Sequence, residues 1–244
     1  MSAEQWESAD LKGMLSLAAG RLSPRKLDLF NVWCCHTLRP YLTDRRSLAA
    51  VRYAEEHVDK GWPDTPEWAA VRDAAQQAVD ELTRWVRLAP NPAELRNRRV
   101  FAHSAKVAQQ AVTNDLPNRG VISNAQFSAY AHGWANDDEP DTFFDDTPAS
   151  DALRQARVRL QEAVFRDIVG NPFHPVAFDP RWWTSDAVGL ARAIYEDRAS
   201  ARMPILADAL MDAGCADDTI IGHCRGPGPH VRGCWVVDLV LGKG

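Results

Sequence analysis

Histidine, cysteine and arginine are concentrated near the end of the chain, in GHCRGPGPHVRGCWVVDLVLGKG, residues 222–244. Imidazole nitrogens and thiolate sulfurs are ligands that zinc prefers. With Cys215 just ahead of the stretch, the possible zinc ligands are Cys215, His223, His230 and Cys234. Zinc sites are usually built from ligand pairs two to four residues apart, and only His230 and Cys234 come near that pattern. We therefore predict no cofactor, and a zinc site stays open as the alternative.

The same stretch also has the character of an anion site. Arg225 and Arg232 flank the Gly-Pro-Gly-Pro turn, and guanidinium groups bind carboxylates and phosphates in a bidentate manner. A phosphate-binding turn, however, depends on successive backbone N–H groups, and Pro227 and Pro229 have none. Anion binding is thus a second alternative.

A structural role accounts best for this stretch. The glycines and prolines predict a rigid corner that directs CWVVDLVL into the core. This apolar segment is either a buried helix ended by Gly242 or a buried strand, and we favour the helix because no partner strand is visible. Asp238 is its single acid, and a buried carboxylate needs a cationic partner. We expect Arg232 or Arg225 to supply it.

A proline-rich aromatic loop, GNPFHPVAFDPRWW at residues 170–183, precedes the last helices. Packing of its tryptophans over a helix junction is the favoured interpretation. The alternative is a small-ligand or enzymatic site where residues 170–184 meet residues 222–234. The ligand-binding candidates for that site are His174, His223, Arg225, His230, Arg232 and Asp238. The chain contains no G-x-S-x-G or H-E-x-x-H motif, so we name no catalytic residue.

The elements that would position these residues are predicted to be helices. Helix starts are marked by an N-cap residue followed by proline at Ser23-Pro24, Thr65-Pro66 and Asn91-Pro92, and by Asp44 as a further cap. Apolar residues then recur at helical spacing, whereas no segment alternates convincingly with period two. We predict an all-α, multi-helix bundle.

The composition changes in the middle of the chain, where an acidic run extends from Asp137 to Asp146. The run lacks the pattern of a calcium-binding loop and is predicted to be a solvated linker. Helical signals resume at Ser150 and continue to Gly170, Gly214 and Gly226, which mark helix ends. We therefore expect two helical subdomains packed together, residues 1–118 and 150–244, joined by an acidic linker, residues 119–149.

The length, net charge and cysteine count limit the class of protein. The chain has 244 residues and a formal net charge of -5, without a basic run that would suggest nucleic-acid binding. Its five cysteines are an odd number and no export signal is apparent, so we expect reduced thiols and a cytoplasmic protein. The most apolar stretch is shorter than the roughly 20 residues that span a bilayer, so we expect no membrane segment.

Several motifs resemble a known group of sequences. The segments FRDIVGNPFHPVAFDPRWW, ARAIYEDRASARMPILADALMDAGC and HCRGPGPHVRGCWVVDLVLGK are similar to the C-terminal half of a large family of uncharacterised planctomycete-type bacterial proteins. RKLDLFNVWCCHTL and LTDRRSLAAVRYAEEHVD resemble the start of that family. The resemblance covers most of the chain outside the acidic linker, and it implies no activity, cofactor or site residue.

The leading function from sequence is a non-catalytic helical protein-interaction module. Nine tryptophans suit a packed core or a partner surface, and no catalytic constellation stands out. We expect a protein partner and neither nucleic acid nor membrane as a partner, with the oligomeric state left open.

Overall fold

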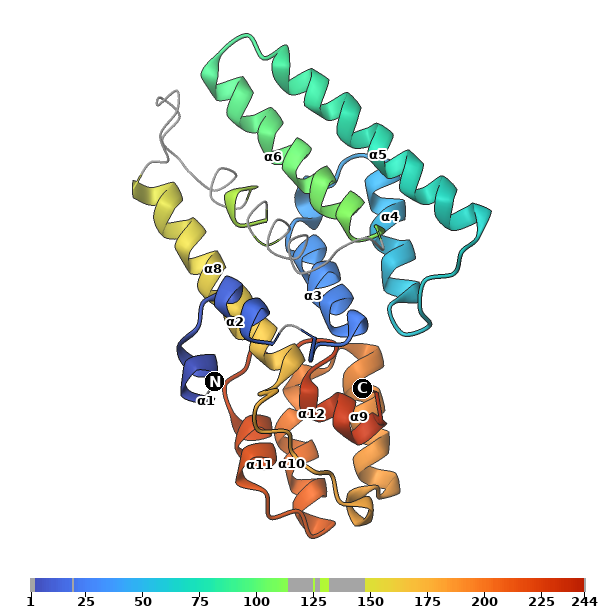
Figure 1. Ribbon diagram of the computed structural model, residues 1–244, viewed down its shortest axis with the longest axis vertical. Coiled ribbons are helices and arrows are strands. Elements are labelled where there is room, and N and C mark those ends of the chain that lie inside the picture. Colours follow the sequence, from blue (N-terminus) through green and yellow to red (C-terminus); the bar gives the residue numbers. More distant parts are fainter. Residues whose placement is uncertain (1–2, 19, 114–124, 126–127, 132–147, 244) are drawn as a thin grey trace. The chain divides into compact units, whose positions relative to one another are not determined.

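The computed structural model describes residues 3–18, 20–113, 125, 128–131 and 148–243. Every regular element in these ranges is a helix, which confirms the all-α prediction (Figure 1). The chain divides into two compact units, one made of residues 1–26 and 162–244 and the other of residues 27–161. This division differs from the expected boundaries, because residues 1–26 pack with the C-terminal part of the chain. The acidic run Asp137–Asp146, and most of the expected linker, lie outside the described residues.

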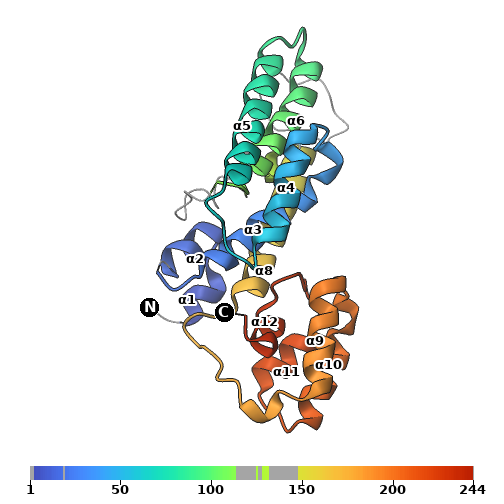
Figure 2. The same ribbon diagram turned by 90° about the vertical axis from the view of Figure 1, so that its right-hand side faces the viewer.

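The unit of residues 27–161 is built around a helical hairpin. Its elements are most of α3 (Pro24–Thr37), the 3-10 helix η1 (Arg39–Tyr41), α4 (Arg45–His57), α5 (Pro66–Arg87), α6 (Pro92–Gln110) and the first part of α8 (Pro148–Val169). α5 and α6 lie side by side, and α4 packs against both (Figures 1 and 2). The predicted caps are confirmed for three of these helices, because Asp44, Thr65 and Asn91 each accept a hydrogen bond from a first-turn N–H.

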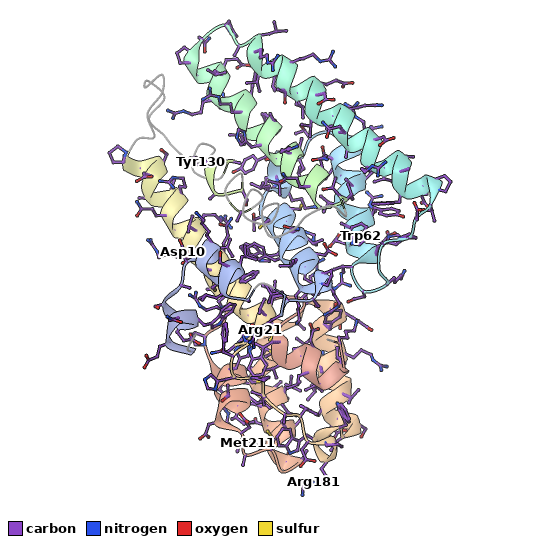
Figure 3. All side chains as sticks on the ribbon, viewed as in Figure 1. Asp10, Arg21, Trp62, Tyr130, Arg181 and Met211 are labelled. Carbon is purple, nitrogen blue, oxygen red and sulfur yellow. The ribbon has the colours of Figure 1, made fainter. Side chains whose placement is uncertain are left out.

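The other unit holds the C-terminal motifs. Its elements are α1 (Ala3–Ser8), α2 (Leu11–Leu17), the last turns of α8, η2 (Pro180–Trp182), α9 (Ser185–Asp197), η3 (Ser200–Arg202), α10 (Met203–Asp212), α11 (Asp218–Arg225) and α12 (Trp235–Leu241). α9 packs against α10 and α12, and α10 also packs against α11. Asp10, labelled in Figure 3, caps α2 by accepting a 2.7 Å hydrogen bond from the Gly13 N–H.

The closing apolar segment is a buried helix, as favoured from the sequence. Val236, Val237 and Val240 of α12 are at most 1% exposed, and they share a core with Leu206 and Leu210 of α10. Gly242 ends α12 in the left-handed conformation, with φ of 65°. The Gly-Pro-Gly-Pro corner therefore does direct this segment into the interior.

The partner expected for Asp238 is wrong. Its carboxylate is bound by Arg25, with an Nη1–Oδ2 distance of 2.7 Å, and by the Lys26 ammonium group. Arg225 instead pairs with exposed Asp208, and the Arg232 guanidinium lies over the Tyr195 ring. The error has a physical reason, since Arg25 and Lys26 precede Asp238 by more than 200 positions and reach it only through the packing of residues 1–26 on α12.

Candidate metal centre

Four side chains with metal-binding atoms converge in the unit that contains the C-terminal motifs. They are Asp167, His223, His230 and Cys234, and their ligand atoms all lie within 4.8 Å of one another. Asp167 is in the last turn of α8, His223 is on α11, His230 ends the corner, and Cys234 immediately precedes α12. A carboxylate oxygen, two imidazole nitrogens and a sulfur thus meet at one point from four segments.

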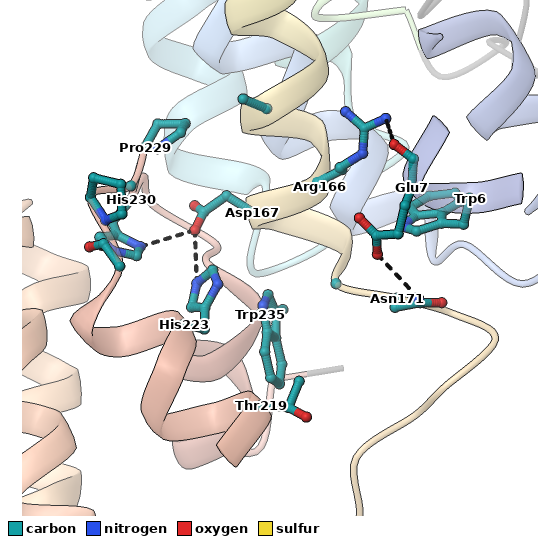
Figure 4. A pocket seen from close by; sticks show the side chains of 15 residues that line it. Trp6, Glu7, Arg166, Asp167, Asn171, Thr219, His223, Pro229, His230 and Trp235 are labelled. Carbon is teal, nitrogen blue, oxygen red and sulfur yellow. Dashed lines mark hydrogen bonds and ion pairs between the residues drawn. The ribbon is translucent and has the colours of Figure 1, made fainter. Parts of the chain in front are cut away.

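Asp167 connects the two histidines of this cluster, and Figure 4 shows its carboxylate between His223 and His230. Its Oδ1 atom lies 3.1 Å from His223 Nε2 and 3.2 Å from His230 Nδ1. Its Oδ2 atom accepts a 2.9 Å hydrogen bond from the Val231 N–H, which holds the carboxylate in place. The Cys234 sulfur lies 3.1 Å from the same His223 nitrogen.

The cluster is well shielded from solvent. Asp167 and Cys234 are 3% and 0% exposed, and both histidines are partly buried. Burial would raise the pKa of Asp167, but the hydrogen bonds with His223, His230 and the Val231 N–H hold it below its usual value. The Asp167 carboxylate is therefore a charged group at neutral pH.

Burial and the Asp167 carboxylate also shift the pKa values of His230 and Cys234. The hydrogen bond to Asp167 raises the pKa of His230 above its usual value, against the opposing effect of burial. Burial, reinforced by the charge of Asp167, raises the pKa of the Cys234 thiol well above its usual value. The raised pKa of His230 shows that the negative charge of Asp167 favours a cation beside it.

Local features of the sequence place three of the four side chains, Asp167, His223 and His230. Gly170, with φ of 70°, ends α8 three residues after Asp167, and a Cβ at this position would lie 3.0 Å from Trp235 Cγ. Asp217 caps α11 by accepting hydrogen bonds from the N–H groups of Thr219 and Ile220. Gly228, with φ of 83°, lets the corner fold back so that His230 reaches Asp167. Each element thus stops or turns close to the cluster.

A pocket of about 440 Å³ opens beside the cluster (Figure 4). Asp167, His223 and His230 line one side of it, and Trp6 and Trp235 provide aromatic surface. Arg166 holds α1 here by donating hydrogen bonds from Nη2 to the carbonyl groups of Glu7 and Ala9. The start of the 170–184 loop, at Gly170 and Asn171, also borders the pocket, so this loop and the corner do meet there.

The structure brings three of the four predicted zinc ligands together. His223, His230 and Cys234 belong to the cluster, whereas Cys215 lies in the apolar core with Ile220 and Cys224. All five cysteines are buried and none forms a disulfide.

The six predicted ligand-binding residues are distributed over several places. His223 and His230 line the pocket beside the cluster, and exposed His174 lines a second pocket, as does Asp238. Arg225 and Arg232 line neither of these pockets.

Asp167 is the residue that sequence reasoning missed. A signal was present, because Val164, Asp167 and Ile168 are spaced i, i+3 and i+4 and therefore share one helical face. Val164 and Ile168 are both fully buried, so an acid between them had to find partners in the interior.

Comparisons with known proteins give no relative for this chain. No family model, curated protein or solved structure matches it. The resemblance to planctomycete-type proteins stays a prediction. Among the described residues, no helix combines the length and apolar character needed to cross a lipid bilayer.

Proposed function

We propose that this protein binds a zinc ion through Asp167, His223, His230 and Cys234. The observation that carries the proposal is the convergence of these four ligand atoms within 4.8 Å of one another. Zinc accepts a mixed set of oxygen, nitrogen and sulfur ligands, whereas magnesium and calcium select oxygen ligands. The mixed character of the cluster therefore favours zinc.

The hydrogen bonding of His230 supports the same proposal. The Gly226 carbonyl can only accept a hydrogen bond, and it lies 3.3 Å from His230 Nε2, so this nitrogen carries a proton. In neutral His230 the lone pair of Nδ1 then faces the Asp167 carboxylate, which is also an acceptor. A cation must separate the two, either a proton on Nδ1 or a metal ion. A backbone carbonyl that fixes the histidine tautomer is a usual outer-shell partner in zinc sites.

The number and burial of the ligands favour a structural ion. Structural zinc sites have four protein ligands, whereas catalytic sites keep one position for water or substrate. Asp167 and Cys234 are almost completely buried. An ion held by this set would join the end of α8, α11, the corner and the start of α12, and so stabilise the unit that contains them.

Metal analysis tests the proposal. The full chain is produced without an affinity tag in zinc-supplemented medium, desalted and analysed by mass spectrometry for metals. We expect about one zinc ion per chain, and a loss of most of this zinc in Cys234→Ser and His230→Gln.

Two matched variants serve as controls. Cys224 is fully buried beside His223 but lies outside the cluster, and His174 is an exposed histidine of the same unit. Cys224→Ser and His174→Gln are expected to retain the zinc. A zinc content near zero in the unmodified protein, or equal zinc in Cys234→Ser and Cys224→Ser, would overturn the proposal and leave a hydrogen-bonded Asp–His network.

The wider role inferred from sequence, a non-catalytic interaction module in the cytoplasm, stays a prediction. A structural zinc site is compatible with this role, because such sites build rigid scaffolds and perform no chemistry. Pull-down from a native lysate, with Cys234→Ser as the comparison, tests whether a partner depends on the zinc-stabilised unit.

A further inference from the structure

A second pocket, of about 700 Å³, lies between the segment that precedes α3, the loop that follows α8, and α12. None of the four proposed zinc ligands lines it. Its volume is in the range of about 300–1,000 Å³ that is typical of small-molecule sites. The residues that define its character are apolar Val176, Trp235 and Leu239, and basic Arg21, Lys26 and Lys243.

The charges at the pocket wall do not balance. Arg25 and Lys26 both bind the Asp238 carboxylate, and the side chains of the two cations are only 14% and 13% exposed. Three of the residues that line the pocket are basic, Arg21, Lys26 and Lys243, and two are acidic, Glu7 and Asp238. Because charges away from bulk water are poorly screened, this excess of positive charge in the lining favours an additional anion.

Arg21 is the exposed arginine of this lining. Its guanidinium lies 5.1 Å from the centre of the Phe173 ring and donates a long, 3.5 Å hydrogen bond to the Pro172 carbonyl. Within the part of the chain that the structure describes, no carboxylate forms an ion pair with Arg21. Arg21, labelled in Figure 3, is exposed and so retains donors for a ligand.

The opposite wall of the pocket is apolar. Val176, Trp235 and Leu239 are partly buried and pack against the core of α9, α10 and α12. Glu7 and Asp238 also line the pocket, and their negative charges disfavour a ligand with several anionic groups. The matching ligand therefore has one negative charge and an apolar body.

From this arrangement we infer that the second pocket binds a small organic monoacid, whose carboxylate contacts Arg21 and Lys26 and whose apolar body lies on Trp235, Val176 and Leu239. This inference is independent of the zinc proposal, because the two sites share no proposed ligand residue. It assigns a binding activity to a pocket that the zinc site does not use.

Calorimetric titration of the full chain with octanoate tests the inference, with octan-1-ol as a neutral probe of the same apolar body. We expect saturable binding of octanoate with one site per chain, and binding of octan-1-ol at least tenfold weaker. Arg21→Gln is expected to weaken octanoate binding about tenfold or more, since it removes a charge-assisted contact.

Arg192→Gln is the matched control, because Arg192 is an exposed arginine of α9 that does not line the pocket. It is expected to bind octanoate like the unmodified protein, and circular dichroism checks that each variant is folded. The inference is overturned if octanoate does not saturate a site, if octan-1-ol binds equally well, or if Arg21→Gln and Arg192→Gln bind octanoate alike.

Discussion

Arg25 donates a 2.7 Å hydrogen bond to Asp238, which lies 213 positions later in the chain. Its second terminal nitrogen donates to the other carboxylate oxygen at 3.1 Å, so the contact is bidentate. The pair joins the beginning of α3 to the last helix. It neutralises Asp238, the buried acid of α12.

Removal of the Asp238 charge should destabilise the protein strongly. Asp238→Asn removes the carboxylate charge that partly buried Arg25 and Lys26 both bind, and loss of one partner from a buried ion pair typically costs about 3–5 kcal/mol. We expect a decrease of about 2–4 kcal/mol in the free energy of unfolding, since both cations keep some solvent contact. Urea unfolding measures this value.

Arg225→Gln is the comparison for Asp238→Asn. Arg225 pairs with Asp208 at the surface, where both side chains are at least half exposed. Exposed ion pairs contribute about 0–1 kcal/mol, so this variant should unfold almost like the unmodified protein. If Asp238→Asn and Arg225→Gln lowered the free energy of unfolding equally, the buried ion pair would not be a main source of stability.

Removal of zinc should lower the melting temperature. A ligand that binds only the folded chain stabilises it by about 2.7 kcal/mol when its free concentration is a hundred times its dissociation constant. We expect treatment with 1,10-phenanthroline to lower the melting temperature by several degrees, and added zinc, but not magnesium, to restore it. Calorimetry records the transition. Cys234→Ser should not respond to the chelator, and a response equal to that of the unmodified protein would argue against the assigned ligands.

Substitution of Gly170 should be costly, although the change adds one methyl group. Gly170 has φ of 70°, and a Cβ there would lie 3.0 Å from Trp235 Cγ. The left-handed conformation alone costs a non-glycine residue about 1–2 kcal/mol, and the contact adds to this. We expect Gly170→Ala to lose at least about 2 kcal/mol in thermal or urea unfolding.

Gly189 provides the matched glycine. It lies within α9, and a Cβ there would have no atom within 4 Å. Alanine in a helix interior is favoured over glycine by about 0.5–1 kcal/mol, so Gly189→Ala should stabilise the protein slightly. If both variants changed stability in the same direction and by similar amounts, the role of the Gly170 conformation would be refuted.

Asp28 should make stability depend on pH in a mildly acidic range. Burial raises its pKa from 3.8 to about 6, although the hydrogen bond from the Trp62 indole N–H, at 2.8 Å, acts in the opposite direction. Between pH 3.8 and about 6 the folded chain then binds more protons at Asp28 than the unfolded chain does. The contribution of Asp28 to stability is therefore present at low pH and is lost as the pH rises through this window.

Asp28→Asn should remove this dependence. The asparagine carbonyl still accepts the Trp62 hydrogen bond, and the uncharged group has no cost of ionisation in the interior. We expect the variant to be more stable than the unmodified protein at pH 7, by about 1–3 kcal/mol, and the difference to shrink toward pH 4. Asp73→Asn, at an exposed acid, should show no such trend in unfolding curves measured at several pH values. If the difference in stability between Asp28→Asn and the unmodified protein were the same at every pH, the raised pKa of Asp28 would be disproved.

The helices themselves were predictable from local sequence. Asp44, Thr65 and Asn91 mark helix starts because an N-cap side chain bonds to N–H groups only two or three residues away. Gly242 marks the end of α12 because the left-handed conformation is a local property of glycine. These interactions join residues within one helical turn, so the local sequence alone predicts where the helices begin and end.

The candidate metal cluster was only partly predictable. His223, His230 and Cys234 stand close together in the chain, and their chemistry identified them as candidates. Asp167 precedes them by more than fifty positions, so nearness in sequence points to Cys215 and not to Asp167 as the fourth ligand. In the structure the fourth member of the cluster is Asp167 of α8, and Cys215 lies outside it.

The amino-acid sequence alone determined that the chain forms capped helices, that its last apolar segment is buried, and that Asp238 needs a cationic partner. Tertiary structure alone decided that Arg25 and Lys26 are the partners of Asp238, and that Asp167 completes the cluster. The reason is the range of the interactions. Backbone hydrogen bonds and caps join residues within a few positions, whereas ion pairs and metal ligands are selected by whichever helical faces pack together.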